Sequence, residues 1–232
     1  MLIKKRPSWA LPHSEVTPES VYLNRRQFMS GTLAVAAGLS VPGLLSAAKL
    51  PVPGEALDFV SMPGFSTDEE KTPFEDVTRY NNFYEFGTGK GDPAKYADEM
   101  TVDPWSVVVE GACDRPGAYA LEDLLKPHEY QERVYRLRCV EAWSMVIPWI
   151  GIPLADILKR LEPTSRAKYV YFETLYDPDQ MRGQRSLFST IDWPYQEGLR
   201  MDEAMNELSF LAVGLYGKTM PNQNGAPIRL VV

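Results

Sequence analysis

The chain of 232 residues has few of the side chains that most often bind metals or act as nucleophiles and bases. It contains two histidines, His13 and His128, and two cysteines, Cys113 and Cys139. A zinc site needs a set of Cys and His ligands, and a thiol protease needs a histidine beside its cysteine, so neither class is supported. The sequence also lacks the Gly-rich phosphate loops of nucleotide-binding proteins.

Positive charge is scarce as well. The formal net charge is -7, and the first 48 residues are basic, so the remainder carries a charge near -10. Proteins that bind nucleic acid need a basic face, so we expect no nucleic-acid partner. The chain does contain 44% hydrophobic and 11% aromatic residues, which is enough for a folded core and excludes disorder throughout.

Residues 1–48 have the layout of an export signal. Twin arginines at 25–26 precede an apolar stretch at 31–45, and small residues at 46–48 are suited to cleavage. The core resembles a twin-arginine signal, a route that carries folded proteins and often follows insertion of a cofactor. A membrane anchor is the alternative, but the apolar stretch is short for a span and contains Gly and Pro. We therefore predict a periplasmic protein with a cofactor.

The rest of the chain divides into two regions. Residues 49–100 are rich in Pro, Gly and acidic residues, which predicts an extended arm with short turns. Residues 101–232 mix strands and short helices without a regular βαβ rhythm, which predicts an α+β domain. Strands are expected at 105–110, 133–140, 168–176, 210–216 and 228–232, and helices at 121–126, 153–161 and 202–207. Because the last expected strand is also the end of the chain, we expect an incomplete domain.

Cys139 has two interpretations. In an exported protein the default is a disulfide, here with Cys113. The alternative is a metal ligand, because a thiolate suits a soft or high-valent metal and the export route indicates a cofactor. Arg136 and Arg138 lie next to it in the sequence; they could favour the thiolate, bind an anionic cofactor, or be solvated on an edge strand.

The segment at 135–153, YRLRCVEAWSMVIPWIGIP, closely resembles the catalytic subunit of bacterial periplasmic protein-methionine-sulfoxide reductases. That family consists of molybdopterin enzymes with the sulfite-oxidase fold. The resemblance implies a mixed-sheet molybdopterin-binding domain at 101–232, an arm at 49–100 that contributes to the cofactor site, and a molybdenum–molybdopterin cofactor. Further similarity is found at 81–87 (NNFYEFG), 172–174, 197–200, 216–218 and 223–230.

The resemblance also implies the residues of the site. Cys139 corresponds to the molybdenum ligand, and Asn82 and Glu141 correspond to residues at the open face of the metal. Glu141 would help to relay protons, or else serve as a structural carboxylate. Trp143, Met145 and Trp149 either line the approach to the metal or pack in the core. The residues that correspond to those holding the molybdopterin are Asn81, Tyr84, Glu85, Thr174, Asn224 and Arg229, the last being best suited to the phosphate.

The function implied by the resemblance is reduction of protein-bound methionine sulfoxide to methionine by oxygen-atom transfer. The implied partners are a membrane haem-binding subunit that donates electrons, and oxidised periplasmic proteins as substrates. One alternative is a sulfite-oxidase-like oxidation of a small oxyanion, which would need arginines gathered near the metal. Another is a non-catalytic periplasmic protein stabilised by a disulfide.

Overall fold

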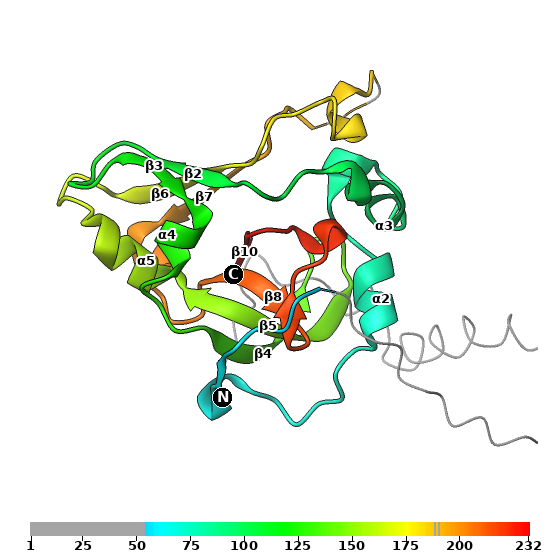
Figure 1. Cartoon of the computed structure of the whole chain (residues 1–232), viewed down its shortest axis with the longest axis horizontal. Coiled ribbons are helices and arrows are strands. Elements are labelled where there is room, and N and C mark those ends of the chain that lie inside the picture. The colour runs from blue at the N-terminus through cyan, green and yellow to red at the C-terminus, as the bar shows by residue number, and fades with distance from the viewer. Residues whose placement is uncertain (1–53, 188, 190) are drawn as a thin grey trace, which may run out of the picture. The chain divides into compact units, whose positions relative to one another are not determined.

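The computed structural model describes residues 54–187, 189 and 191–232, so the predicted signal at 1–48 lies outside the described residues. Its centre is a six-stranded mixed sheet of order β1-β4-β5-β8-β10, with β9 paired to β8 (Figure 1). β1 runs parallel to β4, and the other pairs are antiparallel. These strands are β1 (Val60–Ser61), β4 (Gln131–Arg138), β5 (Ser144–Pro153), β8 (Phe210–Leu215), β9 (Lys218–Thr219) and β10 (Arg229–Val231).

Strand β5 is the centre of the sheet. Every residue from Val146 to Pro153 is buried, as expected for a strand covered on both faces. Its register with β4 runs from Gln131 opposite Gly151 to Arg138 opposite Ser144, so the two strands form one long hairpin. A side chain on Gly151 would overlap the carbonyl oxygen of Leu211 in β8, so glycine permits the close approach at the irregularity beside Ile150.

Two hydrophobic clusters cover the faces of this sheet. Val77 of helix α2 (Phe74–Arg79) packs with Ile147 and Trp149 in one cluster, while Ile152 and Val213 belong to the other. The second cluster contains leucines of α4 (Leu121–Leu125) and α5 (Leu154–Leu161). Burial of each large aliphatic side chain contributes about 1.5–3 kcal/mol, so these helices hold the sheet firmly. The predicted apolar stripe of α5 is buried as expected: Leu154, Ile157, Leu158 and Leu161.

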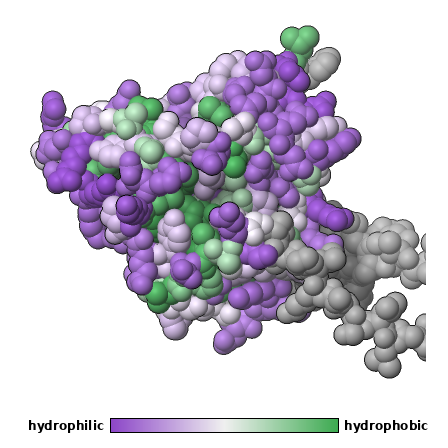
Figure 2. Space-filling model, in the orientation of Figure 1, coloured by the Kyte–Doolittle hydropathy of each residue, from purple (hydrophilic) through white to green (hydrophobic). Residues whose placement is uncertain are grey.

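Two small antiparallel ribbons flank the helices α4 and α5 (Figure 1). On the face seen in Figure 2, the surface is mostly hydrophilic, with an interrupted hydrophobic band near its middle. The ribbons are β2 (Ser106–Val109) with β3 (Gly117–Ala120), and β6 (Tyr169–Glu173) with β7 (Gln196–Arg200). The remaining α-helices are α3 (Asp92–Tyr96) and α6 (Met201–Ala204), and the 3-10 helices are η2 (Pro63–Phe65), η3 (Tyr84–Phe86), η4 (Ala97–Glu99), η5 (Arg182–Arg185) and η6 (Asn222–Asn224).

The α+β class and the mixed sheet are confirmed, but some element boundaries were wrong. The strand expected at 133–140 ends at Arg138, so Cys139 lies just beyond β4. The helix expected at 202–207 is the shorter α6. The region 49–100, expected to be extended, contains α2 and α3 in its described part. Strand β5 was not predicted because its two prolines and Gly151 obscure the strand pattern.

Candidate molybdopterin site

Cys139 begins the tight turn that joins β4 to β5. Its backbone N–H donates to the carbonyl of Trp143 at 2.9 Å, and its own carbonyl accepts from Ala142 at 3.1 Å. Ala142 has a positive φ of 69°, an uncommon conformation for a residue with a side chain. Val140 is 99% exposed, whereas Cys139 is only 9% exposed. The turn therefore presents Val140 to solvent and keeps the thiol against the protein.

Two polar side chains, Asn82 and Glu141, contact this thiol. The amide Nδ2 of Asn82 lies 3.7 Å from Cys139 Sγ, and the thiol donates a hydrogen bond to Glu141 Oε2 at 3.6 Å. The same carboxylate oxygen accepts a hydrogen bond from Trp143 Nε1 at 3.1 Å. The other oxygen, Oε1, forms an ion pair with Lys90. The predicted trio of Cys139, Asn82 and Glu141 is therefore assembled in space.

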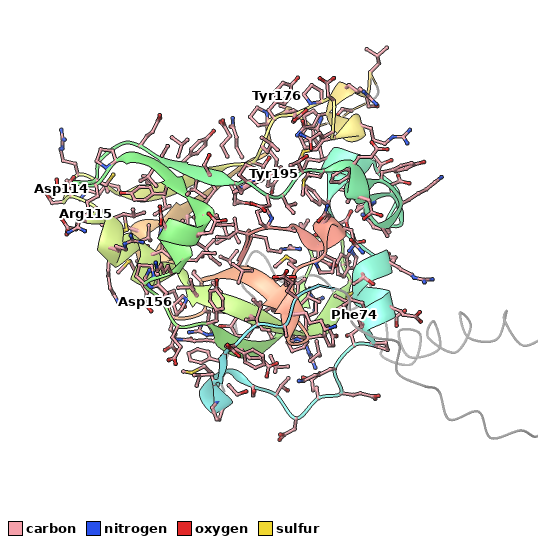
Figure 3. All side chains as sticks on the ribbon, in the orientation of Figure 1. Phe74, Asp114, Arg115, Asp156, Tyr176 and Tyr195 are labelled. Carbon is pink, nitrogen blue, oxygen red and sulfur yellow. The ribbon has the colours of Figure 1, made fainter. Side chains whose placement is uncertain are left out.

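Both cysteines are free thiols, so the disulfide interpretation was wrong. Cys113 forms an isolated backbone bridge with Pro163. Its neighbours Asp114 and Arg115 lie at the outer end of the β2–β3 ribbon, where Figure 3 labels them. The Cys139 thiol is consequently available as a ligand.

A narrow cavity lies beside the β4–β5 turn and contains unusual buried polar atoms. The oxygens Oδ1 of Asn81 and Asn224 and the indole nitrogen of Trp149 are buried without a hydrogen-bond partner. Both asparagine amides donate to the carbonyl of Val77, at 3.1 and 2.9 Å, which fixes their unpartnered oxygens. A buried polar group without a partner is costly, so these three atoms define a place for a polar ligand. The cavity is lined by Val77, Tyr80, Asn81, Asn82, Leu137, Trp143, Met145, Ile147, Trp149, Asn224 and Arg229.

Arg229 contributes a positive charge to the same cavity. Its guanidinium donates to the carbonyl of Asn224 at 2.7 Å and lies 5.2 Å from the centre of the Trp149 ring. Burial lowers the pKa of Arg229 to about 10, opposed by the nearby charges of Cys139 and Glu85. Even so, the group stays cationic at neutral pH. It can therefore bind an anion such as a phosphate.

Glu85 is a buried carboxyl group whose charge interacts with that of Arg229. Burial raises the pKa of Glu85, while its own backbone N–H, the Thr174 hydroxyl and Arg229 lower it. The Thr174 hydroxyl donates to Glu85 Oε1 at 3.4 Å. Thr174 is exposed and follows the end of β6. Its backbone N–H donates to the carbonyl of Tyr195, a residue labelled in Figure 3, at 3.0 Å. Glu85 and Thr174 are thus in contact, as expected if they serve one site.

Of the roles that the sequence left open for Arg136 and Arg138, the structure agrees with solvated side chains on a strand. Arg136 and Arg138 are exposed, and Arg136 forms an ion pair with Glu69. Alternation along the strand turns them away from Tyr135 and Leu137, the face that packs on the core. The cation coupled to Cys139 is instead Arg229, from the distant strand β10.

Sequence reasoning missed one charged residue of the site, Lys90. Its ammonium group binds Glu141 and donates to the hydroxyl of Tyr84 at 2.8 Å. This bond connects Tyr84, a predicted cofactor residue, to the turn that carries Cys139. The only sequence signal was its place in a glycine-rich turn, Gly87 to Asp92, directly after the NNFYEFG segment.

The side chains fit the molybdopterin that the sequence implies. The polar fused ring has N–H groups that need acceptors, and the free oxygens of Asn81 and Asn224 are such acceptors. The ring also has acceptor atoms, to which the indole N–H of Trp149 can donate. The phosphate needs a cation, which Arg229 supplies, and the metal needs a soft donor, which Cys139 supplies. No group of three or more His, Cys, Asp or Glu residues that could hold a metal ion occurs in the part of the chain that the structure describes.

Comparisons with known proteins agree with this chemistry. Residues 94–232 match the oxidoreductase molybdopterin-binding domain family, which covers more than half of the chain. The domain is therefore a molybdopterin-binding oxidoreductase domain with a mixed α/β, sulfite-oxidase-like fold. A crystal structure of the sulfane dehydrogenase SoxCD from Paracoccus pantotrophus is also similar, with a TM-score of 0.48 and 14% identity over 96% of this chain and 55% of that one.

Curated relatives narrow the family. The protein-methionine-sulfoxide reductase catalytic subunit MsrP of Pseudomonas syringae pv. tomato is 54% identical over 245 residues, covering 100% of this chain and 73% of the relative. The corresponding subunit of Xanthomonas campestris pv. campestris is also 54% identical, over 98% of this chain and 70% of the relative. That of Burkholderia mallei is 52% identical. The chain belongs to this family of protein-methionine-sulfoxide reductase catalytic subunits.

Proposed function

We propose that this protein reduces methionine sulfoxide in proteins to methionine, with molybdopterin as cofactor and Cys139 as the protein ligand of the metal. The overall reaction consumes a sulfoxide, two electrons and two protons, and yields a thioether and water. The observation that carries the proposal is the convergence of Asn82 and Glu141 on the Cys139 thiol, beside a cavity with three unpartnered buried polar atoms. The name of the family and the oxidation–reduction chemistry of its cofactor support the same reaction.

The cofactor would be held from several segments of the chain. When bound, the molybdopterin supplies two further sulfur donors and a metal that can exchange two electrons with a sulfoxide. Arg229 would bind its phosphate, and the free oxygens of Asn81 and Asn224 would accept hydrogen bonds from the ring. Glu85, Thr174 and Tyr84 would complete the polar shell from the arm and from the end of β6.

Asn82 and Glu141 would act on the substrate side of the ligand. The Asn82 amide is a hydrogen-bond donor beside the sulfur and can orient the sulfoxide oxygen. The Glu141 carboxylate is a proton carrier two residues beyond the ligand, and it is only partly exposed. Trp143 holds Glu141 Oε2 through its indole N–H and packs edge-on against Tyr80, with ring centres 5.4 Å apart.

Export and electron supply are part of the same proposal. The relatives are catalytic subunits, which implies a partner subunit, and we propose a membrane haem-binding protein as electron donor. The twin arginines at 25–26 support folded export to the periplasm, where oxidised proteins would be the substrates. Among the described residues, the helices are all too short or too polar to cross a membrane. Replacement of both arginines by lysine should leave the loaded protein in the cytoplasm, as measured by fractionation.

The proposal is tested by metal content and by two substrates. Protein purified from a molybdenum-competent host should contain one molybdenum per chain and reduce methionine sulfoxide with an artificial donor. Cys139→Ser should lose the metal and at least ~1,000-fold in kcat/KM, because the ligand thiolate has no replacement. Cys113→Ser is the matched control and should keep both. Oxidation of sulfite at a comparable or higher rate, or full metal content in Cys139→Ser, would overturn the assignment.

A further inference from the structure

Lys90 joins two parts of the site that are far apart in the sequence. Its ammonium group forms an ion pair with Glu141 Oε1, donates to Tyr84 Oη at 2.8 Å, and stands 4.4 Å from the centre of the Tyr84 ring. The side chains of Lys90 and Glu141 are only 23% and 20% exposed. Such a sheltered ion pair holds its partners more firmly than a pair on the open surface.

The backbone around Lys90 is built to keep this side chain in place. The carbonyl of Lys90 accepts a hydrogen bond from Asn81 N at 2.9 Å, and Asp92 Oδ2 accepts from Gly89 N at 2.8 Å. Side chains added at Gly87 or Gly89 would collide with Asp92, so the turn closes tightly on itself. Lys90 therefore projects from a fixed turn that is tied directly to the cofactor residue Asn81.

Glu141, by contrast, lies on a turn that packing alone does not fix. Both of its neighbours in the sequence are exposed to solvent: Val140 is 99% exposed, and Ala142, which has the positive φ noted above, is exposed as well. The carboxylate divides its bonds, with Oε1 on Lys90 and Oε2 on Trp143 and the Cys139 thiol. Without the ion pair, only the contacts of Oε2 with Trp143 and the Cys139 thiol would restrain the carboxylate from rotating about its side-chain torsions.

We propose that Lys90 is a positioning residue, which anchors Glu141 by Oε1 so that Oε2 stays directed at the metal ligand and the substrate. The inference rests on the proposed function, because it assigns Lys90 a role in that reaction through Glu141. Removal of a residue that orients a metal ligand changes activity or affinity by about 10–100-fold. Lys90 acts one contact further out, through Glu141, which contacts the ligand Cys139, so the lower end of this range is expected. Charge and length are both needed, since the ammonium group must reach Glu141 and Tyr84 together.

Kinetics on the molybdenum-loaded enzyme test this role. Lys90→Met should lower kcat by at least ~10-fold and change KM by less than ~3-fold, because the carboxylate is misplaced while the binding surface remains. Lys90→Arg, which keeps the charge, should recover most of kcat. Lys95→Met is the matched control: Lys95 is exposed, lies over the ring of Tyr96, and should be silent. Equal rates in Lys90→Met and wild type would overturn the proposal.

A double-mutant cycle separates positioning from general damage. If Lys90 acts through Glu141, adding Lys90→Met to Glu141→Gln should cost no more than Glu141→Gln alone. Losses that multiply would overturn the proposal, because Lys90 would then act independently of Glu141. The wild-type enzyme separates this failure from a failure of the proposed function. If wild type does not reduce sulfoxides, the proposed function is refuted; if wild type does reduce them, multiplying losses refute only the role of Lys90.

The anchoring itself has a readout that needs no turnover. Four of the chain's five tryptophans lie outside the predicted signal at 1–48, so the nitrogen–proton spectrum of the oxidised, loaded protein without its signal should show four indole signals. Trp143→Phe identifies the signal of Trp143, whose N–H donates to Glu141. That signal should move in Lys90→Met, return toward its place in Lys90→Arg, and stay fixed in Lys95→Met. An unmoved Trp143 signal in folded Lys90→Met or Lys90→Gln would overturn the anchoring.

Discussion

Two arginines packed against the same sheet differ in how fully their donors are used. Arg133 of β4 is 3% exposed and bonds Gln131 Oε1 at 2.7 and 3.0 Å, Tyr135 Oη at 2.8 Å and the carbonyl of Glu207 at 2.5 Å. Its guanidinium also stacks over the rings of Phe65 and Phe210, at 4.0 and 4.9 Å. Arg229 of β10 instead forms one hydrogen bond, to the carbonyl of Asn224, among the described residues.

The difference separates a structural network from a binding site. Arg133 forms four hydrogen bonds with its five N–H donors, so its network is nearly complete and stabilises the fold. Around Arg229 lie two free amide oxygens and a free indole N–H, so the polar groups there are matched only when a ligand arrives. Unpaired buried groups lower the stability of the fold and are retained where they serve binding. The two arginines should therefore respond oppositely to substitution.

The largest effect on stability is expected from Arg133→Met. It removes four hydrogen bonds of a buried side chain and leaves Gln131 and Tyr135 without their donor, which should lower the free energy of unfolding by about 3 kcal/mol. Urea unfolding measures this loss. The molybdenum content of the folded fraction should stay that of wild type. A variant as stable as wild type, or one that folds but loses the metal, would break the comparison.

Arg229→Met should have the opposite profile. Loss of the guanidinium removes the proposed phosphate contact, so we expect ~10–100-fold weaker retention of the cofactor and a matching fall in molybdenum per chain. The cofactor-free protein should be as stable as wild type or more stable, because an incompletely bonded, partly buried cation has been removed. Metal analysis after dialysis, with urea unfolding of the cofactor-free form, measures both. Unchanged metal content would exclude Arg229 from the site.

The fold could be predicted from the sequence wherever one local pattern decided the structure. The apolar stripe of α5 and the buried run of β8 are continuous in the sequence, and both elements lie where they were expected. Strand β5 could not be found this way, because Pro148, Pro153 and Gly151 weaken a strand pattern that tertiary pairing with β4 and β8 restores.

The site residues were available from the sequence only through resemblance to a family. Asn81, Cys139 and Arg229 lie in three separate segments, and no local pattern brings them together. The alternation of β4 could separate the exposed Arg136 from the core, but it could not show that Arg229 would take its place near the thiol. Lys90 was missed for the same reason, since its partner Glu141 is 51 residues away.

The pH dependence of stability should separate Glu85 from surface carboxylates. Burial raises the pKa of Glu85 above its ordinary value of 4.5, so the folded state binds this proton more tightly than the unfolded state. Stability of the cofactor-free protein should therefore fall as pH rises from 4.5 through the folded pKa. Glu85→Gln should remove this fall, and exposed Glu99→Gln should keep it. Urea unfolding at steps of about one unit between about pH 4 and pH 8 measures the free energy of unfolding of each variant. Identical pH dependences for Glu85→Gln and Glu99→Gln would contradict the argument from burial.

The smallest effect is expected from Arg136→Gln, which tests the arginine that lies close to Cys139 only in the sequence. Its ion pair with Glu69 is on the surface, with side chains 59% and 44% exposed, and such pairs contribute at most about 1 kcal/mol. Molybdenum content, kcat and KM should all match wild type, because the guanidinium points away from the cavity. If Arg136→Gln instead lost molybdenum to the extent of Arg229→Met, both arginines would serve the cofactor site, and the contrast between the arginine of the binding site and the other arginines of the sheet would fail.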